Sequence, residues 1–487
     1  MGHIRGVDRE QAVFFPETLD EYVTAENPAR LIDAFVERLD LGVLGFARAE
    51  AAATGRPGYD PADLLRLYIY GYMNRVRSSR RLEREAERNV EVMWLLRKLR
   101  PDFKTIADFR KMHGKELQGV FREFTALCRK MALLGGERVA VDGSKFGAVN
   151  AREKNQTRTG ARKACKEEEK RIQRYLAELD ATDQEDAGTG SEEAVREKLK
   201  AARDRKAGYE AVLARMEESG ETQISRTDPE SRRMPVRGGG TGVCYNVQIA
   251  VDAKHHLICA YEVTDAVNDL GELSEMAVAA KEALKVEALE VLADAGYYDG
   301  KEVAACVSAG VTPMVPKTRN SKQKAGLFPQ ERFRYDAEQD VYHCPADQVL
   351  RPCGSEMVEG RKLQYYAHAA ACQECPLRAR CTEAKQGRRI KRPAEAPLLE
   401  AMERRLKAEP GVWRQRMQLA EHPFGTIKRA MDQGYFLLRG RKKIRGEFAL
   451  TALAYNLKRA INVLGVERLL EKLTGWGREP MRAPLAA

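Results

Sequence analysis

Apolar residues recur at helical spacing through the first part of the chain. Within residues 60–135, the stretches DPADLLRLYIYGYMNRVRSSRRLEREAERN and DFKTIADFRKMH both carry this pattern. We expect Asp60 to cap the first helix, with Pro61 in its first turn, and Thr105 to cap a second helix. The pattern predicts an all-helical region, which by itself is more typical of a solvated bundle than of a DNA-binding domain.

After two consecutive glycines the pattern changes to short β-branched runs. The expected elements are strands over 137–142, 243–252 and 256–264, a helix over 271–286, a strand over 288–294, a helix over 300–309 and a strand over 311–316. This order predicts an α/β layered domain with a mixed sheet. Two of the expected strands end at acidic residues, Asp142 and Asp294.

Two segments interrupt the α/β series. The first contains two charged helices, over 161–181 and 192–217, and predicts a protruding antiparallel hairpin. The second holds a cluster of cysteines. The expected organisation is an N-terminal helical DNA-binding domain (1–135), the first part of the core (136–150), the hairpin and its return loop (151–240), the second part of the core (241–316), a cysteine-rich insertion (317–395), two closing helices (396–465) and a tail (466–487).

Charge restricts the class of partner. The chain has 487 residues, 43% of them hydrophobic, and carries a net charge of +11, which favours a polyanion. No apolar run is long enough to span a membrane and the start has no signal-peptide core, so we expect a cytoplasmic protein and nucleic acid as the anion. The basic runs are RVRSSRR (75–81), KQGRRIKR (385–392) and RGRKKIR, which contains Arg439, Arg441, Lys442 and Lys443. Each run alone is more often a solvated surface, but together they favour DNA.

Three acidic residues are the candidate catalytic groups. Asp142 and Asp294 each end a strand, where the edge of a sheet opens and active sites usually lie. Glu421 lies on an amphipathic helix, whose expected apolar stripe consists of Trp413, Met417, Ala420, Phe424, Ile427 and Met431. Because converging carboxylates repel one another unless a cation separates them, the three predict a site for Mg²⁺ or Mn²⁺. Two such ions about 4 Å apart would support phosphodiester chemistry.

Each of these residues also has a structural interpretation. An aspartate after a strand is often a turn or capping residue. Glu421 lies seven residues from both Arg414 and Lys428, so it could simply pair with either cation on the same face of the helix. Pro423 removes a backbone donor and is expected to kink the helix beside Glu421.

The cysteine cluster predicts a structural Zn²⁺ site. YHCP supplies Cys344, and CQECPLRARC supplies Cys372, Cys375 and Cys381. Four thiolates fit tetrahedral zinc with no open position for catalysis. Reduced thiols in a basic surface module are the alternative, because the spacing is looser than that of two CxxC pairs.

Several motifs in order resemble bacterial insertion-sequence transposases of the DDE class, over about residues 10 to 465. The motifs are FFPETLDEYV, DPADLLRLYIYGYMNRVRSSRRLE, TIADFRKMH, VAVDGSKFGAVNA, YNVQIAVDAKHHLI, LADAGYYDG, EHPFGTIKR and GRKKIRGEFALTALAYNLKRAINVL. The resemblance implies an RNase H-like core and assigns the catalytic aspartates to Asp142 and Asp294 and the glutamate to Glu421. Similar transposases also carry a cysteine-rich insertion before the glutamate.

The resemblance also implies which residues would contact DNA. Lys428 stands at the family's lysine position and Arg416 is the best candidate for its arginine. Trp413 stands where a tyrosine is expected, and its indole would stack on a base.

The implied reaction is metal-dependent cleavage of double-stranded DNA at the terminal inverted repeats of an element. Strand transfer into target DNA follows, carried out by a homodimer that holds both ends. We expect such a protein in the bacterial cytoplasm, associated with the nucleoid. The alternatives are an RNase H-like nuclease that does not join strands, or a transposase-derived protein that binds DNA without cutting it.

Overall fold

A computed structural model describes residues 18–47, 49, 58–150, 155–182, 189–236, 238–317, 327–358 and 360–474. The motif FFPETLDEYV and the expected tail lie partly outside these residues. The first part of the chain is helical. Its elements are η1 (Leu19–Tyr22), α1 (Pro28–Glu37), α2 (Pro61–Met73), α3 (Ser79–Arg88), α4 (Val90–Leu95), α5 (Phe103–Met112) and α6 (Gly114–Lys130).

The caps of two of these helices test the sequence predictions directly. The side chain of Asp60 caps α2, and Pro61 occupies its first turn, as expected. For α5 the expected cap, Thr105, is wrong. Asp102 caps this helix instead, because its carboxylate already accepts two N–H groups of the first turn.

The α/β core has strands β1 (Arg138–Gly147), β4 (Arg232–Pro235), β5 (Thr241–Asp252), β6 (Ile258–Thr264), β7 (Leu289–Leu292) and β8 (Val311–Met314), with helices α9 (Leu273–Leu284) and α10 (Gly300–Ser308). β5 pairs antiparallel with β1, β4 and β6, whereas β7 pairs parallel with β1 and β8. Three antiparallel strands therefore continue into two parallel ones, in the order β6-β5-β1-β7-β8. This arrangement confirms the RNase H-like prediction.

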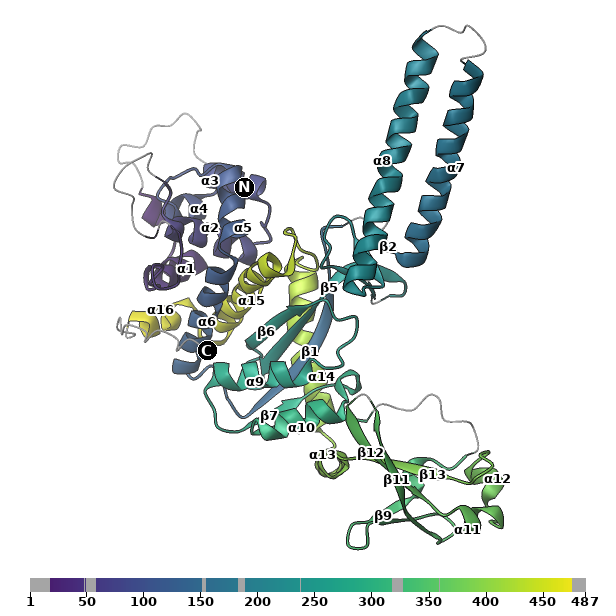
Figure 1. The fold of residues 1–487 in the computed structure, drawn as a ribbon. Coiled ribbons are helices and arrows are strands. Elements are labelled where there is room, and N and C mark those ends of the chain that lie inside the picture. The colour runs from purple at the N-terminus through teal and green to yellow at the C-terminus, as the bar shows by residue number, and fades with distance from the viewer. Residues whose placement is uncertain are drawn as a thin grey trace, which may run out of the picture.

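The closing helices join the helical region to the core. They are α13 (Ala396–Ala408), α14 (Val412–Gly425), the π-helix η5 (Thr426–Ala430), α15 (Arg441–Leu464) and α16 (Val466–Thr474). α15 is buried along most of its length and packs against α2, α6 and β6 (Figure 1). The side chain of Asn456 bonds both the N–H and the carbonyl of Ile258, which fixes α15 against β6. One helix therefore belongs to the cores of both regions.

The first insertion is a long helical hairpin that projects away from the core (Figure 1). It consists of β2 (Asn155–Thr157), α7 (Arg158–Thr182), α8 (Thr189–Ser219) and β3 (Gln223–Ser225). A small apolar core of Ile172, Leu199 and Ala202 lies between the two helices. The predicted charged hairpin is thus confirmed as a projecting pair of helices with few apolar contacts.

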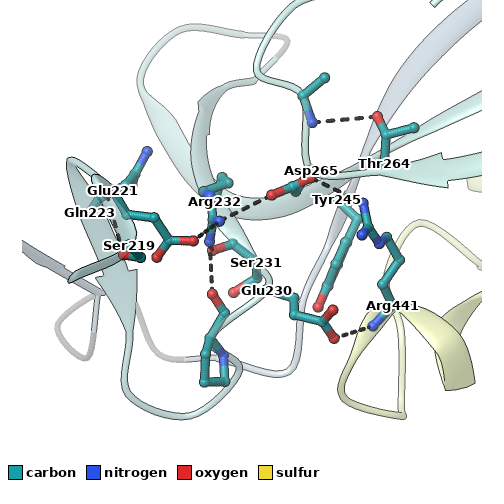
Figure 2. Close-up of polar contacts among 12 residues, drawn as sticks. Ser219, Glu221, Gln223, Glu230, Ser231, Arg232, Tyr245, Thr264, Asp265 and Arg441 are labelled. Atoms are coloured by element: carbon teal, nitrogen blue, oxygen red, sulfur yellow. Dashed lines mark hydrogen bonds and ion pairs between the residues drawn. The ribbon is translucent and has the colours of Figure 1, made fainter. Parts of the chain in front are cut away.

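Ion pairs attach the base of this hairpin to the core (Figure 2). Arg232 contacts the carboxylates of Glu221, at 2.5 Å, and Asp265, at 3.0 Å. Arg441, at the start of α15, contacts the other oxygen of Asp265 at 3.3 Å and donates its backbone N–H to Glu230. Charged contacts with β4, with the residue that follows β6 and with the start of α15 therefore attach the base of the hairpin to the core.

The second insertion forms its own small antiparallel sheet. Its elements are η4 (Gln330–Arg332), β9 (Arg334–Asp336), β10 (Val341–His343), β11 (Val349–Val358), β12 (Arg361–Ala367), α11 (Ala369–Gln373), α12 (Arg378–Cys381) and β13 (Arg389–Pro393). The core of this sheet consists of Phe333, Tyr342, Leu350, Tyr366 and Ile390.

A membrane-spanning segment would need a long, predominantly apolar helix, and none of the helices in the described residues meets that requirement.

The contact between α6 and α15 generates a stability prediction. A Cβ added at Gly446 would lie 2.3 Å from the Cα of Gly114 and 2.6 Å from its carbonyl oxygen, so both backbones would have to move apart. We expect Gly446→Ala to lower the free energy of unfolding by about 1–3 kcal/mol, seen as a lower midpoint of thermal unfolding. Gly425→Ala is the control, because a Cβ there meets no described atom within 4 Å. Equal midpoints for both variants would contradict this account of the packing.

Candidate active site

The candidate site lies where β7 ends beside β1. β7 pairs with β1 only as far as Ala140 opposite Leu292, whereas β1 continues to Gly147. Asp142 and Asp294 each follow their residue of that last pair by two positions. Beyond the pair, the edge of β1 is no longer covered by β7. The two predicted aspartates are therefore brought together at this uncovered edge.

A single guanidinium joins the two carboxylates. Nη2 of Arg416, on α14, lies 2.6 Å from Oδ1 of Asp142 and 3.5 Å from Oδ2 of Asp294. The side chains are 9% (Arg416), 19% (Asp142) and 36% (Asp294) exposed. Arg416 was expected to contact DNA phosphate, but it is buried in the protein between the two aspartates. Its position shows that this place between the carboxylates attracts a cation.

Burial and like charges both act on Asp142. Burial, opposed by the Arg416 guanidinium and reinforced by the nearby carboxylates of Asp294 and Asp269, raises the pKa of this carboxyl to about 6. A cation beside Asp142 is needed to keep its charged form favourable. This electrostatic demand is typical of a functional site rather than of a turn or cap.

Sequence reasoning missed a third carboxylate, Asp269. Its Oδ1 accepts hydrogen bonds from Nδ2 of Asn246 and Nε2 of Gln248, both at 2.7 Å. A Cβ at Gly143 would lie 2.3 Å from the same oxygen, so glycine beside Asp142 makes room for Asp269. Asp269 lies in a loop between β6 and α9 with no apolar periodicity, so nothing in the sequence pattern identified it.

The predicted apolar stripe of the helix that carries Glu421 is confirmed for four residues and wrong for the first two. Ala420, Phe424, Ile427 and Met431 are buried as expected. Trp413 and Met417 are instead 40% and 39% exposed. The buried face of this half contains Arg416 and Leu419, because Arg416 turns inward to the two aspartates.

Glu421 consequently lies on the exposed side of α14, away from the face that meets the sheet. The kink expected at Pro423 takes a different form. α14 continues through Pro423 to Gly425 and then becomes the π-helix η5. The structure therefore brings Asp142 and Asp294 together but leaves Glu421 outside the pair.

Lys428, in η5, is tied to β1 close to Asp142. Its Nζ donates to Oγ of Ser144 at 2.5 Å and to the carbonyl of Lys145 at 2.7 Å, and it lies 4.6 Å from the ring centroid of Phe146. Lys428 thus places a positive charge next to the aspartate pair.

The other predicted DNA contacts lie at the start of α15. Arg439, Lys442 and Lys443 are exposed. Arg441 is half-buried and is held by Asp265 in the base of the hairpin. Arg439, Lys442 and Lys443 can therefore contact DNA phosphates, and none of the ion pairs described here would have to break for that contact.

The four predicted zinc ligands lie in one module. Burial raises the pKa of the Cys381 thiol, Arg388 opposes this rise, and Cys372, Cys344 and Cys375 add to it. The four thiols are therefore close enough to interact. In the part of the chain that the structure describes, however, no three His, Cys, Asp or Glu side chains lie in an arrangement that would hold one metal ion, either here or at the aspartates.

Two transposase family models match parts of this chain. A family model described as "Transposase domain (DUF772)" matches residues 17–112, and a model described as "Transposase DDE domain" matches residues 343–461. The second range includes the four cysteines, Glu421 and Lys428 but neither aspartate. A comparison with curated proteins gave no match.

One solved structure is similar over 92% of this chain and 79% of its own. It is the cryo-EM structure of a piggyBac transposase synaptic complex with hairpin DNA, with a TM-score of 0.32 and 8% sequence identity.

The bridge between Arg416 and Asp142 predicts strong coupling. We expect Arg416→Gln to destabilise the protein, because it leaves two carboxylates close together without their cation. The further loss should be small when Asp142→Asn is already present. A double-mutant cycle measured by denaturant unfolding in the presence of a chelator should give a coupling of about 1–3 kcal/mol. Additive effects of the two substitutions would contradict the bridge.

Proposed function

We propose, from the premise that this chain belongs to the DDE transposases of insertion sequences, that it cuts DNA at the ends of its element and joins those ends to target DNA. One observation supports the proposal most: Asp142 and Asp294 follow the last paired residues of adjacent parallel strands and share one cation. This is the arrangement that the reaction requires of its acidic groups.

The donor set at this edge fits a hard divalent ion. Asp142 and Asp294 offer carboxylate oxygens, and the guanidinium of Arg416 lies between them as the positive charge. These two aspartates would hold Mg²⁺ or Mn²⁺, which supplies activation of the attacking oxygen and stabilisation of the leaving oxygen. We propose that Arg416 turns away from the carboxylates when a metal ion takes its place.

The other residues near the pair act on DNA. Lys428 would neutralise a phosphate beside the scissile bond, because Ser144 and the carbonyl of Lys145 hold its ammonium next to Asp142. The exposed Trp413 would stack on a base, and Arg439 would contact the backbone. Glu421 enters as the third acidic group from the family resemblance alone, and to take part its carboxylate would have to reach the pair from the exposed side of α14.

In the proposed sequence of events, water attacks first and frees a 3′-hydroxyl. That hydroxyl then attacks a phosphodiester of the target DNA and displaces the target's 3′-hydroxyl as the P–O bond breaks, without a covalent protein–DNA intermediate. The excess of positive charge on the chain favours a nucleic-acid partner, and the proposed reaction makes that partner double-stranded DNA. Holding two ends at once would require a homodimer on DNA.

Substitution of the aspartates tests the chemistry. We expect Asp142→Asn and Asp294→Asn to abolish cutting of a duplex that carries the DNA flanking the gene, because each removes a charged ligand while preserving size. Binding of the same duplex, measured by fluorescence anisotropy, should be unchanged. Cleavage by Asp142→Asn at the wild-type rate in Mg²⁺ would disprove the assignment.

A matched control accompanies this experiment. Asp347→Asn makes the same chemical change at an exposed position with φ of 54°, which asparagine tolerates. It should cut as wild type does. Joined products distinguish a transposase from a nuclease that only cuts, and a wild-type protein that binds without cutting would support the non-catalytic alternative.

We further propose that the cysteine-rich insertion holds one structural Zn²⁺ through Cys344, Cys372, Cys375 and Cys381. Support comes from the interaction of the other three thiols with Cys381 and from the small size of the sheet's apolar core. Bringing the four sulfurs to ligand distance requires adjustments of their side chains. The ion would stabilise the module and take no part in cutting.

Metal analysis tests the zinc proposal. Purified protein should contain about one zinc per chain, and Cys375→Ser or Cys381→Ser should lose it and become more sensitive to proteolysis within the insertion. Cys353→Ser is the control, because Cys353 is an exposed thiol on the same sheet and is not among the four. Wild-type protein without zinc, or equal loss in Cys353→Ser, would refute the site.

A further inference from the structure

Tyr435 is an exposed aromatic residue whose backbone is held firmly in place. It forms a bridge with Gly147, the last residue of β1. The N–H of Gly147 donates to the carbonyl of Gly434, and the N–H of Phe436 donates to the carbonyl of Gly147. The side chain of Tyr435 nevertheless remains 46% exposed. The protein therefore presents this ring to solvent from a fixed position.

A buried arginine supports one face of the Tyr435 ring. The guanidinium carbon of Arg77 lies 4.4 Å from the ring centroid, in a cation–π contact. Arg77 is only 6% exposed, and its guanidinium donates to the carbonyl of Tyr435 at 2.8 Å and to that of Asp432 at 3.2 Å. The fully buried carboxylate of Glu447 lies 3.9 Å from the same guanidinium. Because Arg77 covers one face, the exposed surface of the ring lies on its other face and its edge.

The ring lies on the same edge of β1 as the acidic pair. β5 occupies the other edge of β1 along its whole length, so the bridge to Tyr435 is on the edge where β7 ends. On the way from the acidic pair to this bridge, the carbonyl of Lys145 accepts a hydrogen bond from Lys428. A Cβ at Gly434 would lie 3.6 Å from Cγ of Lys428, so the loop of Tyr435 and the stem of this lysine are neighbours.

The order of groups along this edge fits a strand of DNA. From Asp142 to Gly147, β1 advances by five residues, or about 17 Å at about 3.4 Å per residue. The same length corresponds to about five nucleotides of one DNA strand. Carboxylates come first, the ammonium of Lys428 follows, and the aromatic ring comes last. Cations contact phosphates and aromatic rings stack on bases, so each group has a counterpart on one strand.

We infer that Tyr435 stacks on an unpaired DNA base a few nucleotides from the scissile phosphate, with Arg77 behind its ring. The inference rests on the proposed function for the path of the DNA past the acidic pair. A base inside an intact duplex has both faces covered, so the partner is a nucleotide that is already unpaired. Stacking tolerates any base, so Tyr435 contributes affinity and position rather than sequence specificity. In the alternative, the ring only packs on Arg77 and holds the loop.

Binding of single-stranded DNA to the full-length protein tests the inference. In fluorescence anisotropy with a labelled oligothymidine, Tyr435→Ala should bind about tenfold or more weakly than wild type, because the stacking surface is lost. Tyr435→Phe should bind nearly as wild type does, because phenylalanine keeps the ring. A fully paired duplex of unrelated sequence should bind equally well to wild type and to Tyr435→Ala.

The salt dependence separates stacking from phosphate contact. Tyr435→Ala should leave the slope of log affinity against log salt concentration unchanged, whereas Lys428→Met should reduce this slope by about one. Tyr22→Ala is the matched control, because it removes another exposed tyrosine, in η1 of the helical region. It should bind the oligothymidine as wild type does.

The outcomes distinguish this inference from the proposed function. Wild-type affinity of Tyr435→Ala for the oligothymidine would overturn the inference, even in a protein that cuts and joins DNA. Equal losses in Tyr435→Ala and Tyr435→Phe, or an equal loss for the paired duplex, would also overturn it. A wild-type protein that never cuts DNA, but whose oligothymidine affinity depends on the ring, would contradict the proposed function and keep the stacking site.

A measurement on the wild-type protein covers the case in which circular dichroism shows that Tyr435→Ala does not fold. Irradiation of the complex with an oligothymidine that contains 5-iodouracil crosslinks the base to an aromatic side chain stacked on it. Mass spectrometry should place a crosslink at Tyr435. Crosslinks at other residues alone would overturn the inference.

Discussion

The repulsion between Asp142 and Asp294 is the constraint on which the arrangement of the core depends. Adjacent parallel strands place these carboxylates side by side with only limited exposure to water. Arg416 offsets the repulsion, and to reach both groups it must lie on the face of α14 that meets the sheet. The rotation of α14 follows, and with it the exposure of Trp413 and Glu421. One charge balance thus decides which side chains of the helix reach the site.

The sequence predicted the two aspartates for a sound physical reason. Parallel neighbours end at the same edge, so acidic residues at strand ends come together whenever the strands are adjacent. The orientation of α14 was not predictable in this way. Its residues allow two overlapping buried faces, one apolar and one containing Arg416, and only contact with the sheet selects the second. The position of Asp269 could not be predicted either, because its loop comes to lie beside Gly143 only when the chain is folded.

The length of β1 and the cap of α5 also differ from the predictions, and in both cases local contacts explain the difference. β1 extends to Gly147, beyond the strand end expected at Asp142, because β5 pairs with it along the whole length despite the polar residues. The carboxylate of Asp102 caps the helix three residues earlier than expected, and it accepts both the N–H and the hydroxyl of Thr105. The projecting hairpin, by contrast, could be predicted from its charged sequence, because only a few of its residues pack into an apolar cluster.

The way the hairpin is attached has a mechanical consequence. α8 contains 31 residues and so spans about 46 Å at about 1.5 Å per residue. One turn of duplex DNA is about 34 Å long. Ion pairs of Arg232 and Arg441 connect the base of this arm to the sheet and to α15. A force on α8 is therefore passed through these ion pairs to the helix shared by both cores.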